Sequence, residues 1–298
     1  MELSVIIPTH NRRDFLFYEI SHIYMQRKVD FEIIVLNDIE ELDATDEITS
    51  IFPNVVYIKD SSIQGPSNKH KAGYAIAKGA YLYMPDDDDY LTDPMFFRKA
   101  IDCLEKNRNL SFVSGQCEIS YEYEDTSQNS IELHQTNVHG FVKRAEYLQE
   151  FQHRMDKPLS TVSTVFRKQA FDETNAINMI EMSDSSMYMQ ALLWGDAYIL
   201  NDYVAVYRIK DGSLTSTLKY DFMMNVLRQK ELLYEKSKNL LVNPRDFWFQ
   251  QYALSYKFFP NKTKKVRRDL TSWGIRHNHG SKKMLILCLY EKIKSYIL

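Results

Sequence analysis

An apolar stretch that runs into four consecutive aspartates constrains the fold of this chain more than any other feature. Residues 80–84, Ala-Tyr-Leu-Tyr-Met, form the short apolar and aromatic run expected of a buried strand. Pro85 has no backbone N–H to donate to a sheet, so the strand is expected to end there. The aspartates, residues 86–89, follow at its carboxyl end, and in an extended chain their side chains would point alternately to opposite sides.

Four adjacent carboxylates oppose one another's ionisation unless a cation neutralises them. Such oxygen-rich clusters suit a hard divalent cation, here Mg²⁺ or Mn²⁺. A solvated acidic turn is the alternative interpretation. The place of the cluster favours a ligand site, because open α/β sheets bind ligands beyond the carboxyl ends of their strands. An EF-hand loop is excluded, since its sixth and twelfth positions counted from Asp86 would be Leu91 and Phe97 rather than Gly and Glu.

Length and composition are those of a globular protein with a large core. The chain has 298 residues, of which 44% are hydrophobic and 26% charged, and its net charge of −3 gives no reason to expect a nucleic-acid partner. Its three cysteines lack metal-ligand spacing and indicate a reducing compartment. The apolar run 284–290 is far shorter than the about 20 residues that span a bilayer. With no signal peptide before the first strand, a cytoplasmic protein is expected.

Strands and helices are expected to alternate over most of the chain, which predicts an α/β protein with a mainly parallel sheet flanked by helices. The expected strands are 3–8, 31–36, 55–59, 80–84, 110–115, 160–166, 197–200 and 204–208. The expected helices are 14–27, one after Asp38, 73–78, 94–107 and 185–194. Residues 61–71 are expected to form a polar loop, and 118–137 have no assignment.

A basic, helical tail is expected after Thr217. From Gln251 to the end, eleven lysines and arginines oppose two acidic residues, a net charge of +9. Within the tail, apolar residues recur every fourth position beside Lys282 and Lys283, which places them near one helical face: Leu285, Leu289, Ile293 and Ile297. This pattern is typical of a helix that lies on a membrane surface, and also of one packed on the protein or in a homodimer contact.

The sequence lacks the motifs of other nucleotide-binding sites and of hydrolase active sites. No G-x-G-x-x-G follows the first strand, and no G-x-x-x-x-G-K-[ST] or G-x-S-x-G is present. These absences count against a Rossmann dehydrogenase, a P-loop NTPase and an α/β-hydrolase.

Taken in order, several segments resemble the GT-A fold family 2 of inverting glycosyltransferases. They are residues 4–12, 34–38, 73–81 and 86–89, Asp184, and 207–215. The resemblance covers about residues 3–216. It implies a catalytic domain over 1–216, with a nucleotide-sugar half over 1–91 and an acceptor half over 92–216, followed by the basic helical region 217–298.

The resemblance also implies roles for individual residues. Asp88 would bind the Mg²⁺ or Mn²⁺ that bridges the donor's two phosphates, and Asp184 would be the general base. The donor would be bound by Pro8, Thr9, His10, Asn11, Arg12, Asp38, Lys71, Asp86, Asp87 and Lys210. In this set the loop after the first strand and Asp38 hold the nucleobase, while Asp86 and Asp87 approach the ribose and the sugar.

The chain departs from the family pattern near three of these positions. Ser183 stands where a Glu usually precedes the base, and His70-Lys71 stands for Arg-Asn. Lys210 replaces a frequent His. Lys69, Lys71 or Lys210 could neutralise phosphate as point charges, or each could be a solvated lysine.

The resemblance implies an inverting, metal-dependent transfer from a nucleotide-diphosphate sugar, with UDP as the expected nucleotide. The acceptor would be a hydroxyl of a glycan or a lipid-linked saccharide in cell-surface polysaccharide synthesis, which suits a cytoplasmic protein peripheral to the inner face of the membrane. Two alternatives stay open: a sugar-nucleotide pyrophosphorylase, and a degenerate domain that binds sugar or serves as a scaffold.

Overall fold

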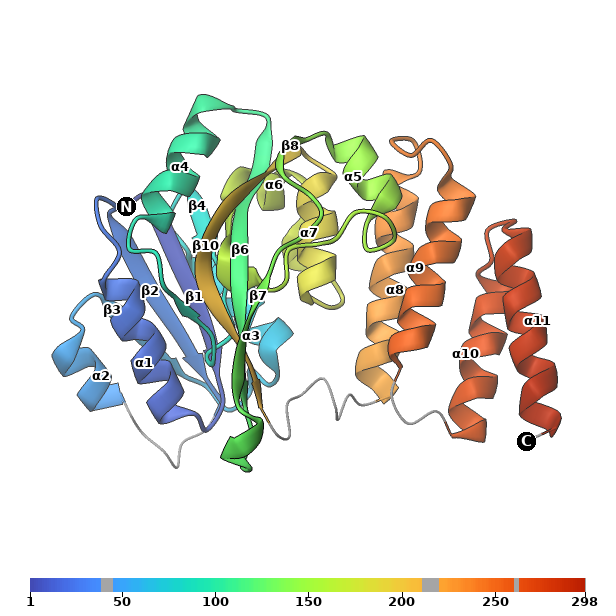
Figure 1. The fold of residues 1–298 in the computed structure, drawn as a ribbon, viewed down its shortest axis with the longest axis horizontal. Helices are drawn as coiled ribbons and strands as arrows, with labels where there is room; N and C mark the ends of the chain where they lie inside the picture. The colour runs from blue at the N-terminus through green and yellow to red at the C-terminus, as the bar shows by residue number, and fades with distance from the viewer. Residues whose placement is uncertain (39–44, 211–219, 260–262, 298) are drawn as a thin grey trace. The chain divides into compact units, whose positions relative to one another are not determined.

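The computed structural model describes residues 1–38, 45–210, 220–259 and 263–297 (Figure 1). The chain divides into two compact units. The first comprises Met1–Arg144 and Asp156–Asp211, and the second Ala145–Met155 and Gly212–Leu298. The expected boundary at Thr217 and residues 211–215 of the family-like segment lie outside the described residues.

The first unit is built on a mixed sheet with the strand order β3-β2-β1-β4-β9-β6-β10-β5. Its strands are β1 (Leu3–Thr9), β2 (Phe31–Asn37), β3 (Val55–Lys59), β4 (Tyr81–Tyr83), β5 (Tyr90–Leu91), β6 (Leu110–Glu122), β7 (Ser130–His134), β8 (Gly140–Val142), β9 (Thr164–Arg167) and β10 (Asp196–Lys210). Strands β1 to β4 pair in parallel, as expected, and β6 is parallel to β10. Strand β9 is antiparallel to both β4 and β6, so the sheet changes direction there.

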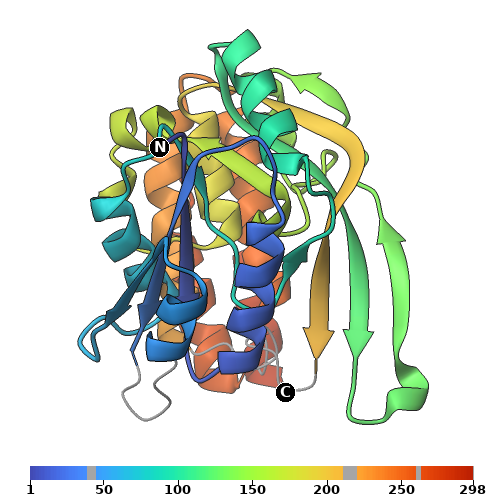
Figure 2. The same ribbon diagram turned by 90° about the vertical axis from the view of Figure 1, so that its left-hand side faces the viewer.

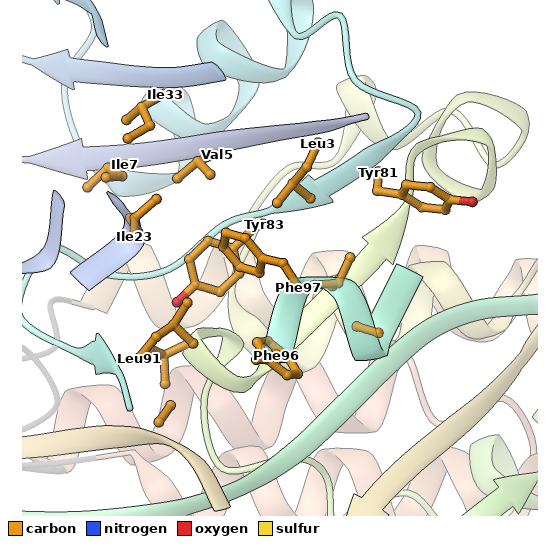
Figure 3. Packing of buried hydrophobic residues seen from close by; sticks show 14 of the residues in the cluster. Leu3, Val5, Ile7, Ile23, Ile33, Tyr81, Tyr83, Leu91, Phe96 and Phe97 are labelled. Atoms are coloured by element: carbon orange, nitrogen blue, oxygen red, sulfur yellow. The ribbon is translucent and has the colours of Figure 1, made fainter. Parts of the chain in front are cut away.

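Helices cover both faces of this sheet. Those of the first unit are α1 (Arg13–Tyr24), α2 (Thr45–Ile51), α3 (Pro66–Ile76), α4 (Phe96–Lys106), α6 (Lys168–Glu173) and α7 (Asp184–Leu192). Alternate residues of β1 point to one face and pack with α1 and α4 in a buried cluster that includes Leu3, Val5, Ile7, Leu16 and Phe97 (Figure 3). On the other face, Gly73 brings α3 so close to β1 that a Cβ there would overlap the Ile6 side chain.

Three local predictions were wrong. Helix α3 begins at Pro66, inside the predicted polar loop, because proline suits the first helical position and the helix turns its polar Lys69 and His70 inward. Strand β6 continues past residue 115 to Glu122, where β7 and β10 lie beside it (Figure 2). The two predicted strands 197–200 and 204–208 form the single strand β10, whose register shifts between Ile199 and Tyr203.

The second unit is helical, which confirms the predicted helical C-terminal region. It comprises α5 (Arg144–Glu150), whose first residue belongs to the first unit, with α8 (Tyr220–Ser237), α9 (Pro244–Phe258), α10 (Lys264–Arg276) and α11 (Lys282–Ile297). The buried Trp248 and Trp273 join α9 to α10, with 5.9 Å between their ring centroids. Among the described helices, none has the length and apolar character needed to cross a bilayer.

Candidate active site

The loops that follow β1, β2 and β4 meet at one edge of the sheet because these strands are parallel and adjacent. The loop after β1 reaches the aspartate cluster directly. Thr9 Oγ1 donates to Asp87 Oδ2 at 2.7 Å, and Arg12 Nη1 donates to Asp87 Oδ1 at 2.8 Å and to Asp88 Oδ2 at 2.9 Å. The sheet therefore brings together the candidate residues of the first and fourth strands.

The chain turns at residues 87–88, and Arg12 contacts both carboxylates of that turn. Burial alternates along the four aspartates, as the predicted alternation of their side chains leads one to expect. Asp87 and Asp89 are buried, with 4% and 1% of their surface exposed. Asp89 accepts from Ser160 Oγ at 3.1 Å and from the backbone N–H of Arg208 at 2.9 Å. Asp87 and Asp89 thus fix the loop, and the partly exposed members are Asp86 and Asp88.

The carboxylates of the cluster oppose one another's ionisation. Burial, with the charges of Asp184, Asp88 and Asp87, raises the pKa of Asp86 to about 8. Lys210 Nζ lies 3.3 Å from Asp88 Oδ2, and burial lowers the pKa of Lys210 while Asp88 opposes that change. The carboxylates accordingly remain suited to a further cation or to hydroxyl donors.

Asp88 fits the role of a single protein ligand to a divalent cation. Mg²⁺ in proteins often binds through one or two carboxylates, with substrate phosphates and water completing its shell. Within the described ranges, no three His, Cys, Asp or Glu side chains gather as a metal site. Lys210, which replaces the frequent family histidine, has no lone pair to offer while it is protonated. A cation here would therefore depend on donor phosphates and would share Asp88 with Arg12 and Lys210.

Asp38 is held beside the same loop by a lysine and a histidine. Its Oδ1 lies 2.7 Å from Lys69 Nζ and 2.6 Å from His10 Nδ1. Lys69, only 3% exposed, also donates to the carbonyl of Thr9 at 2.6 Å. Burial raises the pKa of Asp38 and the contacts with Lys69 and His10 lower it, with a net decrease. Lys69 therefore joins two strand ends rather than facing solvent.

The remaining residues predicted to bind the sugar donor are Pro8, Asn11 and Lys71. Pro8 is buried in β1, while Asn11 is exposed and has a left-handed backbone with φ of 56°. Lys71 is partly buried on α3 and near Glu181, whose pKa is raised by burial and lowered in part by Ser67 and Lys71. Asn11 is thus accessible to a ligand, and Lys71 acts on a carboxylate outside the aspartate cluster.

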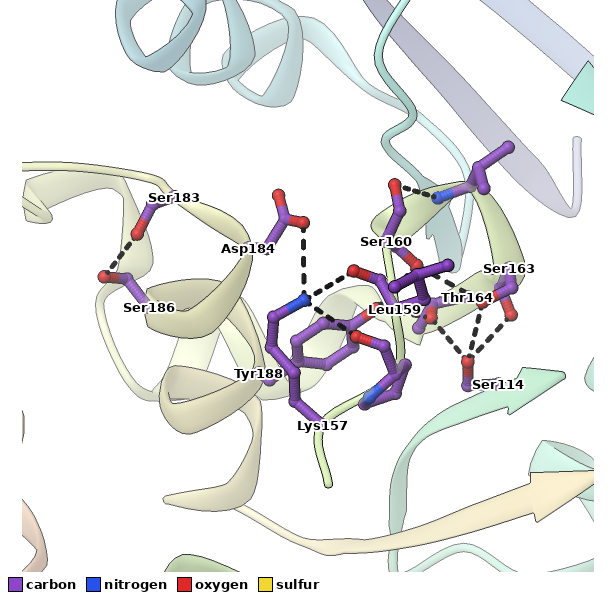
Figure 4. A network of polar contacts seen from close by, with 12 residues as sticks. Ser114, Lys157, Leu159, Ser160, Ser163, Thr164, Ser183, Asp184, Ser186 and Tyr188 are labelled. Atoms are coloured by element: carbon purple, nitrogen blue, oxygen red, sulfur yellow. Dashed lines mark hydrogen bonds and ion pairs between the residues drawn. The ribbon is translucent and has the colours of Figure 1, made fainter. Parts of the chain in front are cut away.

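Asp184 opens α7, and its charge is the second largest cause of the raised pKa of Asp86. Its side chain lies near Lys157, whose Nζ is 3.7 Å from Asp184 Oδ2 (Figure 4). The same ammonium donates to the carbonyls of Pro158 at 2.8 Å and Leu159 at 2.6 Å. The hydroxyl of Ser183, the residue that stands where the family usually has Glu, forms a hydrogen bond with Ser186 Oγ at 3.0 Å.

Sequence reasoning missed Lys157 and Arg208. Burial lowers the pKa of Lys157, while the charge of Asp184 opposes that change. The guanidinium of Arg208 donates to the carbonyl of Asp88 at 3.3 Å and stacks over Tyr18 and Tyr90, with 4.8 and 4.6 Å to the ring centroids. The position of Arg208 in the family-like segment 207–215 was the only signal for it, and Lys157 had none.

Known proteins similar in sequence are bacterial glycosyltransferases. An uncharacterized glycosyltransferase of Haemophilus influenzae is 29% identical over 122 residues, 40% of this chain and 41% of that protein. The glycosyltransferase GlyG of Streptococcus pneumoniae serotype 4 is 25% identical over 228 residues, 72% of this chain and 73% of GlyG. The GalNAc(5)-diNAcBac-PP-undecaprenol beta-1,3-glucosyltransferase of Campylobacter jejuni is 30% identical over 132 residues, 41% of this chain and 40% of that protein. The similarity thus spans less than half the length of the Haemophilus influenzae and Campylobacter jejuni proteins.

Solved structures share the fold. Residues 1–349 of S. aureus TarS match with a TM-score of 0.64 at 15% identity, covering 99% of this chain and 89% of that chain. The mannosyltransferase PcManGT of Pyrobaculum calidifontis was solved with GDP-Man and Mn²⁺. It matches with a TM-score of 0.52 at 11% identity, covering 99% of this chain and 87% of that chain.

The family itself is identified from the sequence. Residues 4–195 match the family described as glycosyl transferase family 2, a region that holds the strand-end loops, the aspartate cluster and Asp184. The chain therefore belongs to glycosyl transferase family 2.

Proposed function

We propose that this enzyme moves a sugar from a UDP-sugar to a hydroxyl of a glycan or a lipid-linked saccharide, with inversion at the anomeric carbon. The observation that carries the proposal is the meeting of the β1 loop with the aspartate cluster, where Arg12 binds Asp87 and Asp88, together with Asp184 at the start of α7. Two comparisons support the substrate classes. TarS has been solved in complex with UDP-GlcNAc, and the Campylobacter jejuni relative is named for an undecaprenol-linked acceptor.

In this proposal Asp184 is the general base. Its carboxylate takes the proton from the acceptor hydroxyl as that oxygen forms a bond to the anomeric carbon. The bond from the anomeric carbon to the diphosphate oxygen breaks at the same time, and UDP leaves with the electron pair. Attack from the face opposite the leaving group inverts the anomeric configuration. The ammonium of Lys157, 3.7 Å from Asp184 Oδ2, holds the carboxylate in position.

The donor is assigned to the catalytic domain, proposed as residues 1–216. Asp38 and the loop of Pro8, Thr9, His10, Asn11 and Arg12 receive the nucleobase, and Asp86 and Asp87 approach the ribose and the sugar. Lys71 and Lys210 add positive charge toward the diphosphate. Mg²⁺ or Mn²⁺ held by Asp88 and the donor phosphates would stabilise the negative charge of the leaving diphosphate.

Turnover of nucleotide sugars tests this proposal. We would incubate the full chain with a panel of UDP- and GDP-sugars and a short undecaprenyl-diphosphate-linked saccharide, with Mn²⁺ or with EDTA, and measure nucleotide release. UDP release that requires acceptor and metal is expected. Binding without turnover over the whole panel would indicate a non-catalytic module. Pyrophosphate-dependent formation of UTP from a UDP-sugar would indicate a pyrophosphorylase.

A further inference from the structure

The outward face of α11 is apolar. Ile286, Leu289, Tyr290 and Ile293 have 67%, 45%, 60% and 61% of their surface exposed. Their spacing of three and four residues places them on one side of the helix, here called the α11 apolar face. Leu289 and Ile293 belonged to the set predicted from the sequence. Leu285 is partly buried, and Ile297 lies outside the residues whose side chains are described.

The opposite side of α11 holds the helix in place within the second unit. Met284 and Cys288 are fully buried, and Cys288 Sγ contacts the Tyr252 hydroxyl at 3.5 Å. Glu291 accepts from the Tyr256 hydroxyl at 2.9 Å. Because this side is packed, the helix cannot turn its apolar face inward without losing these contacts.

Basic residues predominate in the helix pair that carries the α11 apolar face. Helices α10 and α11 contain nine lysines and arginines but only two acidic residues, Asp269 and Glu291. Lys283 Nζ lies 2.7 Å from Asp246 Oδ1, and Lys282 is exposed at the start of the apolar face. The helix pair therefore combines an exposed apolar face with an excess of positive charge.

We propose that the α11 apolar face binds an anionic phospholipid surface, with its apolar side chains among the acyl chains and its lysines at the headgroups. Helices with this distribution lie in the membrane interface, where tyrosine is also favoured. Charge complementarity identifies the occupant, since anionic lipid attracts lysine and arginine. If the proposed lipid-linked acceptor is correct, binding here would concentrate the enzyme at its substrate.

A second copy of the chain fits this face less well. In a symmetric dimer the same patch meets itself, so the cations of α10 and α11 would lie opposite their own equivalents. Like charges across an interface oppose association. The same apolar area on an anionic membrane gains electrostatic attraction instead, which favours lipid as the partner.

Vesicle flotation tests the proposal on the full chain. We expect the protein to float with vesicles of phosphatidylcholine and phosphatidylglycerol, to stay at the bottom with phosphatidylcholine alone, and to lose binding in high salt. The Ile286→Gln, Ile293→Gln double variant should lose flotation. A matched control, Leu232→Gln with Val242→Gln, alters residues of the same unit that are 43% and 89% exposed and should float like the wild type.

Three results would overturn the proposal. They are failure of the wild type to float with anionic vesicles, flotation of the Ile286/Ile293 variant at the wild-type level, and a wild-type dimer that this variant converts to a monomer without any lipid binding. Thermal melting establishes that each variant is folded. UDP-sugar turnover with a water-soluble acceptor, measured on the same samples, separates failure of the membrane proposal from failure of the proposed function.

Discussion

The ammonium group of Lys157 lies 3.7 Å from Oδ2 of Asp184 and is anchored by two backbone carbonyls of its own loop. The ammonium group therefore has a fixed position beside the candidate base. This arrangement makes Lys157 a positioning residue for Asp184.

Replacing Lys157 by Met should lower kcat, because Asp184 loses the ammonium group that holds its carboxylate in place. Lys157→Arg keeps a cation beside Asp184 and should restore most of the wild-type kcat. Measuring kcat for the wild type and both variants checks this, with UDP affinity as the measure of donor binding and thermal melting as the measure of folding. If Met and Arg lower kcat equally, the charge of Lys157 has no part in turnover and the residue supports the structure alone.

The Asp184→Asn variant separates catalysis from helix capping. Asparagine keeps the size of the side chain and its capping ability but cannot accept the proton. Loss of a general base should lower kcat by a factor on the order of 10²–10⁴. UDP affinity measured by calorimetry should stay at the wild-type value. Turnover close to that of the wild type would assign the base to another residue.

Much of the candidate site was predictable because strand direction is readable from sequence. The alternation of strands and helices predicted a mainly parallel sheet, and parallel strands bring their carboxyl ends to one edge, as β1, β2 and β4 do. The contact between Thr9 and Asp87 follows from that arrangement. The pairing of Arg12 with both Asp87 and Asp88 did not follow, because it depends on the turn at these residues.

Contacts made by packing alone were not predictable. Lys157 meets Asp184 through a loop that has no periodicity, so no local pattern relates the two residues. Helix α3 was obscured for another reason. Gly65-Pro66 is a recognisable helix start, yet the inward residues Lys69 and His70 are polar and hide the apolar periodicity on which helix prediction depends.

Lys210 offers a test of the metal assignment that does not depend on turnover. A neutral imidazole can coordinate Mn²⁺ whereas an ammonium cannot, so Lys210→His should raise Mn²⁺ affinity in the presence of UDP. Asp88→Ala should abolish the effect of Mn²⁺ on UDP affinity and leave the protein folded. Calorimetric titration of UDP into each variant, with and without Mn²⁺, gives both results. Unchanged UDP affinity of Asp88→Ala in Mn²⁺ would remove Asp88 from the metal site.

His70 should make the free energy of unfolding depend on pH. Burial lowers the pKa of His70 to about 4, against 6.5 for the free side chain. As the pH falls below 6.5, the unfolded chain therefore binds a proton that the folded protein accepts only near pH 4. Between pH 6.5 and 5 this linkage should cost about 2 kcal/mol of stability. Above pH 6.5 both states are neutral at this residue and the effect vanishes.

The His70→Met variant isolates this contribution, because other titrating groups such as Asp86 are present in both proteins and cancel in the difference. Urea unfolding at pH 7 and at pH 5 measures it. The wild type should lose more stability than the variant between these pH values, by about 2 kcal/mol. Substitution of the exposed His139 by Met serves as control and should leave the wild-type pH dependence in place. Equal losses in the wild type and in His70→Met would mean that His70 is solvated and can take up a proton in the folded state.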